Sequence, residues 1–337
     1  MNSFNEIMQQ ITGGLTGDKD HDATYLMEQC EQYKGHEMAK EIIRACSRLM
    51  YSLISEEDRQ KMTQAIMNAT QGYESILEEA QFKVYQKRYD EALSILENLI
   101  HQVEEMGMYR DDQVSEYHCF NEFFEEVLYK EWEHPQKTLR SCDFPYALIY
   151  TRYGSLLFEM GRYDEARKAL SVAMKWNPAN VYIAFEHAET YKAKGEIEEF
   201  HQRTLDAFRY AYRPEHVARC LRNLGYYYVE MKSWNEALAC YQRSLSYEPT
   251  AKEAIAELYY IREKSGVDLR HFTQEELDRF DFPTEPDRDV IGLAYAYGKY
   301  FMEQEDAAGA RYCLQIVYGL THDKRIKEMI DNLPEEA

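Results

Sequence analysis

Three acidic residues near the start of the chain alternate as calcium ligands do. Asp18, Asp20 and Asp22 match the first positions of a calcium-binding loop. That loop also needs a glycine for its sharp turn and a glutamate that binds the ion through both oxygens. Ala23 and Gln29 stand at those two places. We therefore predict no calcium site, and no metal elsewhere in the chain.

The other residues that could act in catalysis are scattered along the chain. The 10 histidines are dispersed, and no HExxH string, phosphate-binding glycine-rich loop or GxSxG string is present. Adjacent glutamates such as Glu104-Glu105 are typical of solvated helix surfaces, because paired catalytic acids must be close in space rather than in sequence. We predict that the protein is not an enzyme and uses no cofactor.

The charge of the chain argues against nucleic-acid binding. Its 337 residues carry 60 acidic and 39 basic side chains, which gives a formal net charge of −21. A protein that neutralises phosphates needs a basic face, and this surface would repel the polymer. With 45% hydrophobic residues, the chain has enough apolar surface to form a core.

The termini and cysteines indicate the compartment. The first ten residues lack the features of a signal peptide, and no run of about 18 apolar residues occurs, so we expect no membrane segment. The 7 cysteines form no CxxC pair, and their number is odd. This pattern favours reduced thiols, and we predict a cytoplasmic protein.

A short string recurs at long intervals. The sequence Arg-Tyr-Asp-Glu-Ala occurs at 88–92 and again at 162–166, with looser copies at 233–237 and 306–310. The spacing is about 73 residues, which indicates a repeat architecture.

A shorter unit lies inside this period. The spacing of large, small and proline residues across 218–251 resembles the signature of the tetratricopeptide repeat, a unit of about 34 residues, as found in bacterial proteins. The residues that carry the resemblance are Leu221, Leu224, Gly225, Tyr228, Ala237, Tyr241 and Pro249. The unit at 147–180 repeats the pattern, and 291–324 does so without the proline. The resemblance implies an all-α, right-handed superhelix of paired antiparallel helices.

Small residues recur at two fixed places in these units. Two helices can approach closely only where small side chains meet, and a glycine inside a helix otherwise costs about 1 kcal/mol relative to alanine. We therefore expect packing contacts between them. The pairs are Gly154 with Ala166, Gly225 with Ala237, and Gly298 with Ala310.

The pattern divides the chain into four parts. An amphipathic arm with a glycine-rich joint covers 1–17, a helical cap covers 18–72, the repeat array covers 73–332, and a tail covers 333–337. Within the cap we predict a helix at 56–70 with Ser55 as its N-cap. The repeat units lie near 73–106, 111–146, 147–180, 181–214, 218–251, 252–289 and 291–324.

Some units are degenerate copies of the repeat. Residues 181–214 have His187 where the family favours leucine and Phe200 where it favours alanine. We interpret His187 as a partly buried core residue. In 111–146 and 252–289 we expect one helix each, followed by an irregular connection.

The resemblance also implies where a partner binds. The first helix of each repeat lines the concave groove of such an array, and arginines there favour a carboxylate while aromatic faces suit an extended peptide. Internal ion pairs with Glu186 and Glu189 are the open alternative for the arginines. The candidate groove residues are Arg152, Tyr182, Phe185, Arg219, Arg222, Asn223 and Tyr226.

We therefore predict a protein-interaction or peptide-binding scaffold whose partner is a protein or peptide, through an acidic or C-terminal carboxylate group. Self-association stays open. One alternative is a peptide-gated regulatory receptor, because a helical bundle before a repeat array is similar in layout to Gram-positive quorum-sensing receptors. Another is an enzyme on a tetratricopeptide frame, with a pocket joining His187 or His118 to carboxylates.

Overall fold

The protein was analysed as a computed structural model, which describes residues 3–53, 55, 72–106, 109–142 and 144–334. The chain forms two compact units. The first comprises the residues up to Cys119 together with Pro135–Pro145, and the second comprises Phe120–His134 and the chain from Tyr146 onward. The helix predicted at 56–70 lies outside the described residues.

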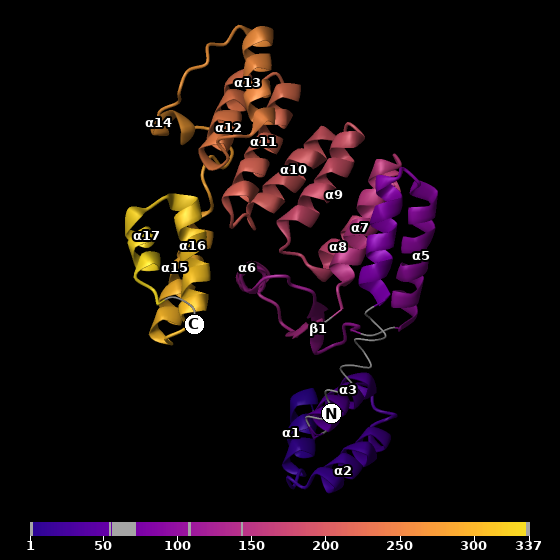
Figure 1. The fold of residues 1–337 in the computed structure, drawn as a ribbon. Coiled ribbons are helices and arrows are strands. Elements are labelled where there is room, and N and C mark those ends of the chain that lie inside the picture. The colour runs from indigo at the N-terminus through magenta and orange to yellow at the C-terminus, as the bar shows by residue number, and fades with distance from the viewer. Residues whose placement is uncertain (1–2, 54, 56–71, 107–108, 143, 335–337) are drawn as a thin grey trace. The chain divides into compact units, whose positions relative to one another are not determined.

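The first unit begins with a three-helix bundle, shown in indigo in Figure 1. It consists of α1 (Phe4–Gly13), α2 (Lys19–Gln32) and α3 (Ala39–Leu53). Ser3 and Glu6 form a capping box that starts α1. The apolar stripe of α1 packs onto α2 and α3, so the N-terminal arm has its docking site in this bundle. The buried core is Ile7, Ile11, Leu26, Ile42 and Cys46.

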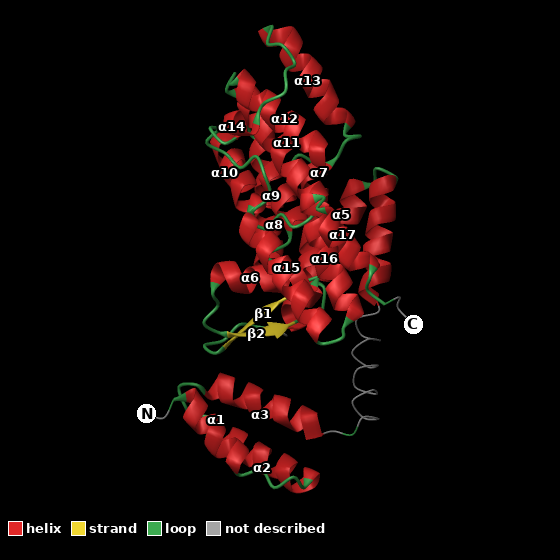
Figure 2. Ribbon diagram, turned by 90° about the vertical axis from the view of Figure 1, so that its left-hand side faces the viewer, coloured by secondary structure: helices red, strands yellow, loops and turns green. Residues whose placement is uncertain are grey.

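A small sheet follows in the first unit after the helical residues 72–85 and α5 (Tyr89–Met106). The strands β1 (Ser115–His118) and β2 (Thr138–Ser141) pair in parallel, as the arrows in Figure 2 show. We predicted no strand here. Each strand has only 4 residues, too few for an alternating pattern to be visible in the sequence.

The second unit contains the repeat helices, each packed on the next from α7 to α13 (Figure 1). This arrangement confirms the predicted all-α superhelical solenoid. None of the described helices is both long and apolar enough to cross a membrane. The helices are α7 (Tyr146–Glu159), α8 (Tyr163–Trp176), α9 (Val181–Ala193), α10 (Ile197–Phe208), α11 (Pro214–Glu230), α12 (Trp234–Tyr247) and α13 (Lys252–Ser265).

Glycines mark the closest approaches between paired helices. A Cβ atom added at Gly225 would lie 2.8 Å from the ring of Tyr241, closer than real Cβ atoms come. Gly154 stands in the same relation to Leu170, and Gly298 to Leu314. The side chain nearest to each glycine thus lies four residues after the alanine with which we expected the glycine to pack. The alanines themselves, Ala166, Ala237 and Ala310, are fully buried.

The remaining helices of the second unit are α6 (Phe123–Glu133), α14 (Gln274–Leu277), α15 (Arg288–Glu303), α16 (Ala307–Thr321) and α17 (Lys324–Asp331). One buried cluster contains Phe124 and Leu128 of α6, Leu221 of α11, and Leu314 and Val317 of α16. A shared core therefore ties α6 and the last helices to the repeats.

Candidate functional site

Two of the predicted groove arginines have partners within the chain. Arg219 of α11 lies 3.5 Å from the carboxylate of Glu186 on α9, and its guanidinium is 4.6 Å from the ring centroid of Phe185. Phe185 is fully buried, so it offers no surface to a ligand. Arg222 lies 2.6 Å from Glu248, which follows α12. The internal ion pair left open by the sequence is therefore present at Arg219, whereas Arg222 pairs with Glu248 rather than with Glu186 or Glu189.

The first helices of three successive repeats are α9, α11 and α13. Their side chains interact through Lys192, Tyr226 and Glu257. The Lys192 Nζ of α9 lies 4.2 Å from the ring centroid of Tyr226 on α11. Burial raises the pKa of the Tyr226 hydroxyl, and the carboxylates of Glu230, Glu189 and Glu257 raise it further. Burial also raises the pKa of Glu257 on α13, which Lys192 opposes. Lys192 of α9 thus contacts the Tyr226 ring of α11, and its charge also acts on Glu257 of α13.

We call the surface that carries these side chains the inner face. Its carboxylates and cations are interspersed, so it differs from a purely cationic clamp and suits a partner that carries both charges. Lys192 was missed in the sequence, although it lies three residues after Glu189 and therefore on the same side of its helix. The inner face consists of Glu186, Glu189, Lys192, Arg219, Arg222, Tyr226 and Glu257.

Asn223, Tyr182 and Arg152 complete the predicted set. Asn223 is only 6% exposed, and among the described residues no hydrogen-bond partner reaches its Nδ2 atom. Because the side chain of Asn223 is buried, it offers little surface to a ligand in the groove. Tyr182 is 49% exposed and meets the His216 ring edge-on at 4.9 Å. Arg152 is exposed on α7.

A second polar cluster surrounds Glu122, just before α6. Its carboxylate accepts hydrogen bonds from the Tyr212 hydroxyl at 3.1 Å and the Tyr312 hydroxyl at 2.8 Å, and it pairs with Arg213. These partners come from the loop before α11 and from α16. The cluster therefore ties the start of α6 to the loop before α11 and to α16.

Glu125 anchors the first turn of α6. Its two oxygens accept hydrogen bonds from Asn177 Nδ2 at 2.8 Å and from Asn180 Nδ2 at 2.9 Å, and the backbone N–H of Asn121 donates at 2.7 Å. Burial raises the pKa of Glu125, while these donors act in the opposite direction. The carboxylate therefore ties the start of α6 to the connection between α8 and α9.

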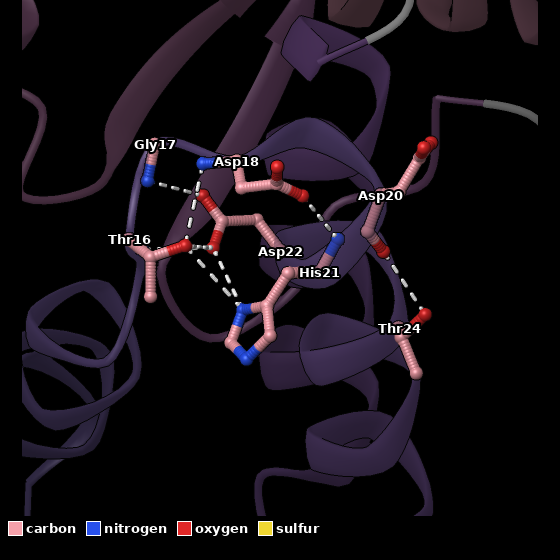
Figure 3. Close-up of polar contacts among 7 residues, drawn as sticks. All are labelled: Thr16, Gly17, Asp18, Asp20, His21, Asp22 and Thr24. Atoms are coloured by element: carbon pink, nitrogen blue, oxygen red, sulfur yellow. Dashed lines mark hydrogen bonds and ion pairs between the residues drawn. The ribbon is translucent and has the colours of Figure 1, made fainter.

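Figure 3 shows what the alternating aspartates do. Asp22 accepts hydrogen bonds from the backbone N–H of Thr16 at 2.8 Å and of Gly17 at 2.9 Å, and these donors hold its pKa down at about 2. Asp18 caps α2 by accepting from the N–H of His21 at 2.9 Å. The carboxylates fix the turn before α2. In the described part of the chain, no group of three or more His, Cys, Asp or Glu side chains is placed to hold a metal.

The two histidines of the enzyme alternative are both buried. His187 on α9 is 7% exposed, and its Nε2 atom lies 3.1 Å from Ser171 Oγ on α8. Burial, with Arg203 and Arg167 nearby, lowers its pKa to about 4. His118 of β1 lies 3.5 Å from the carboxylate of Glu116. A small cavity of about 50 Å³ adjoins His187.

Two segments of the chain match models of the tetratricopeptide repeat family. The matches cover residues 147–180 and 218–251, which are the two units with the clearest repeat signature. Curated proteins give no significant match. We call these two segments the full repeats and 181–214 the degenerate repeat.

Several solved structures resemble the chain. The first TPR of Spaghetti (RPAP3), bound to the HSP90 peptide SRMEEVD, is 24% identical with a TM-score of 0.33, over 36% of this chain and 94% of that one. YrrB, a TPR protein with an unusual peptide-binding site, is 17% identical with a TM-score of 0.31, over 63% and 99%. A tetratricopeptide repeat protein from Parabacteroides merdae is 14% identical with a TM-score of 0.39, over 92% and 97%. With TM-scores this low, these resemblances carry no conclusion about the inner face.

Proposed function

We propose, from the premise that this chain carries tetratricopeptide repeats at 147–180 and 218–251, that it is a protein-interaction scaffold whose partner lies along the inner face. Repeat arrays present long concave surfaces of this kind. The observation that carries the proposal is the contact of Lys192 with Tyr226, 4.2 Å apart, next to Glu257. It supports a continuous surface across α9, α11 and α13.

The chemistry of this surface favours an extended segment with charges of both signs. Arg219 is only loosely paired, at 3.5 Å from Glu186, so an acidic side chain or a C-terminal carboxylate of the partner can take over its guanidinium. Glu189 and Glu257 would accept a basic residue of the same segment.

We place this interaction in the cytoplasm. All 7 cysteines are free thiols, which is typical of a reducing compartment.

The test is an affinity capture from native cell extract. The intact protein is compared with a variant in which the inner-face residues Arg219 and Arg222 are changed to alanine together with Arg152, the predicted groove residue on the first helix of the preceding repeat. A partner retained by the intact protein and lost by the variant supports binding at the inner face. Equal retention by both proteins contradicts it.

A matched control removes the same charge elsewhere. Lys168, Arg209 and Lys232 are exposed cations outside the inner face, and a triple alanine variant at these positions should retain the partner. Loss of the partner from both triple variants would indicate attraction by overall charge rather than by this surface. A fold check by circular dichroism accompanies each variant.

A further inference from the structure

The helix α13 has one packed side and one open side. Ala254 and Ile261 are buried in a cluster that also contains Tyr241 of α12, the main neighbour of α13. In the full repeats, the first helix packs against the second helix of its own repeat, as α11 does against α12. The 4-residue α14 follows α13 instead of such a helix, and Figures 1 and 2 show α13 at the outer edge of the repeat helices. The side of α13 that faces away from α12 is therefore open.

The open side of α13 carries large side chains. Tyr259 is 59% exposed, Tyr260 is 42% exposed and Ile255 is 38% exposed. Tyr259 stands one repeat interval of about 34 residues after Gly225. Gly225 lets the ring of Tyr241 approach its helix closely, whereas a tyrosine at the same place projects outward. The open side of α13 is therefore not shaped for the second helix of a repeat.

Four residues form a stripe along the middle of this open side. Lys252, Ala256, Tyr259 and Glu263 are exposed, and their spacings of 4, 3 and 4 residues follow the period of the helix. We call them the α13 stripe. The stripe has opposite charges at its two ends, and a small and a large residue between them. If two such helices pair in antiparallel orientation, Lys252 of one copy lies opposite Glu263 of the other. Ala256 of one copy then lies opposite Tyr259 of the other.

Both kinds of contact are complementary. A cation meets a carboxylate at each end of the pair, and each tyrosine ring packs over an alanine methyl group. Within the described chain, no ion pair engages Lys252 or Glu263. In a parallel pair, each charge would meet its own copy, which is unfavourable. The charges and sizes of the stripe therefore favour an antiparallel second copy of the same helix.

The α13 stripe is separate from the inner face. Glu257 belongs to the inner face and lies about a third of a turn away from the middle of the stripe. Pairing through the stripe uses none of the inner-face residues. This inference therefore does not rest on the function proposed above, and either one can fail without the other.

We propose that a second copy of this chain docks on α13, helix against helix in antiparallel orientation. The α13 stripe forms the centre of the contact, and Ile255 and Tyr260 flank it on opposite sides. A single helix pair buries less than the roughly 1,200 Å² of a stable interface, so the dimer forms at micromolar concentrations and is reversible. The dimer carries two inner faces, which strengthens the binding of a partner that has two matching segments.

The first test is sedimentation velocity of the full chain between about 1 and 100 μM. The protein should shift from monomer to dimer over this range. Tyr259→Asp should weaken the dimer at least about tenfold, because a central aromatic contact is replaced by a charge. Tyr300→Asp on α15 is the matched control, since Tyr300 is 53% exposed and lies outside the stripe. A monomer at all concentrations, or equal dimerisation of the two variants, would overturn the proposal.

Exchange of the two charges tests the antiparallel orientation. Lys252→Glu alone, or Glu263→Lys alone, places like charges at both ends of the pair and should weaken the dimer about tenfold. The double variant should restore it, and so should an equimolar mixture of the two single variants. Dimerisation that is unchanged in the single variants would contradict the pairing. So would single variants that are weakened and are restored neither by the double change nor by mixing.

Discussion

In the full repeats, a glycine of the first helix faces a large side chain of the second. Gly225 meets the ring of Tyr241, as Gly154 meets Leu170. The equivalent residues of the degenerate repeat are Ala188 and Thr204, and Thr204 turns its hydroxyl to its own helix, donating to the Phe200 carbonyl at 2.9 Å.

The difference extends to the neighbouring positions. Where the full repeat at 218–251 has Leu221 and Leu224, the degenerate repeat has Ala184 and His187, and a cavity lies beside them. Residues that follow the repeat signature fill the space between the two helices of a pair and hold them in close contact. Residues that depart from it leave space and polar atoms inside the helix layer.

The largest expected effect is the loss of stability that follows when a full repeat is overpacked. Gly225→Leu should lower the free energy of unfolding by about 3 kcal/mol, because even a Cβ atom would lie 2.8 Å from Tyr241. Urea titration measures the change. Gly292→Leu is the control, since a Cβ atom at Gly292 meets nothing within 4 Å. Equal stability of the two variants would refute the packing described for the full repeats.

The second prediction concerns how the stability of the protein depends on the degenerate repeat at low pH. The pKa of His187 is lowered from 6.5 to about 4, so the folded state favours the neutral ring. Its contribution to stability is complete above pH 6.5 and is lost as the pH falls toward 4. Between pH 7 and pH 4 the wild type should lose about 3 kcal/mol more than His187→Leu does. Parallel pH profiles of the two proteins in urea titrations would contradict this.

At neutral pH the same substitution should have a smaller effect of opposite sign. His187→Leu replaces a buried ring that has one unpaired nitrogen with the leucine of the repeat signature. We expect the free energy of unfolding to rise by about 1 kcal/mol. Thermal unfolding at pH 7 measures this change. A clear loss of stability would mean that the hydrogen bond to Ser171 stabilises the fold by more than the unpaired Nδ1 atom destabilises it.

The smallest effect is expected at the inner face. Replacing both Arg219 and Arg222 with glutamine should cost about 1 kcal/mol or less, because partly exposed ion pairs contribute little. Folding should be intact while partner binding weakens. Collapse of the fold in this variant would show that the two arginines are structural.

Local spacing made much of the fold predictable. The interval of about 34 residues identified the paired helices and the glycine positions, and the all-α superhelix is confirmed. The same interval placed His187 in the core. These features depend on residues within one helix pair, which a sequence pattern records directly.

Contacts between distant residues were not predictable. Glu122 and Tyr312 are 190 positions apart, and nothing in their local sequence marks the pairing. The partner of Arg222 is Glu248 rather than the expected Glu186 or Glu189, because Arg222 lies beside the end of α12. The cavity likewise arises from three helices together.

The central claim is that the inner face of α9, α11 and α13 is the interaction surface. The most direct measurement is photo-crosslinking with p-benzoylphenylalanine in place of Tyr182, which is exposed on α9 four residues before Glu186 and therefore on the inner-face side of that helix. A second protein carries the crosslinker in place of Val172, which is exposed on α8. We expect an adduct with another protein in cell extract at position 182 and none at position 172. An adduct at position 172 alone, or none at position 182, would contradict it.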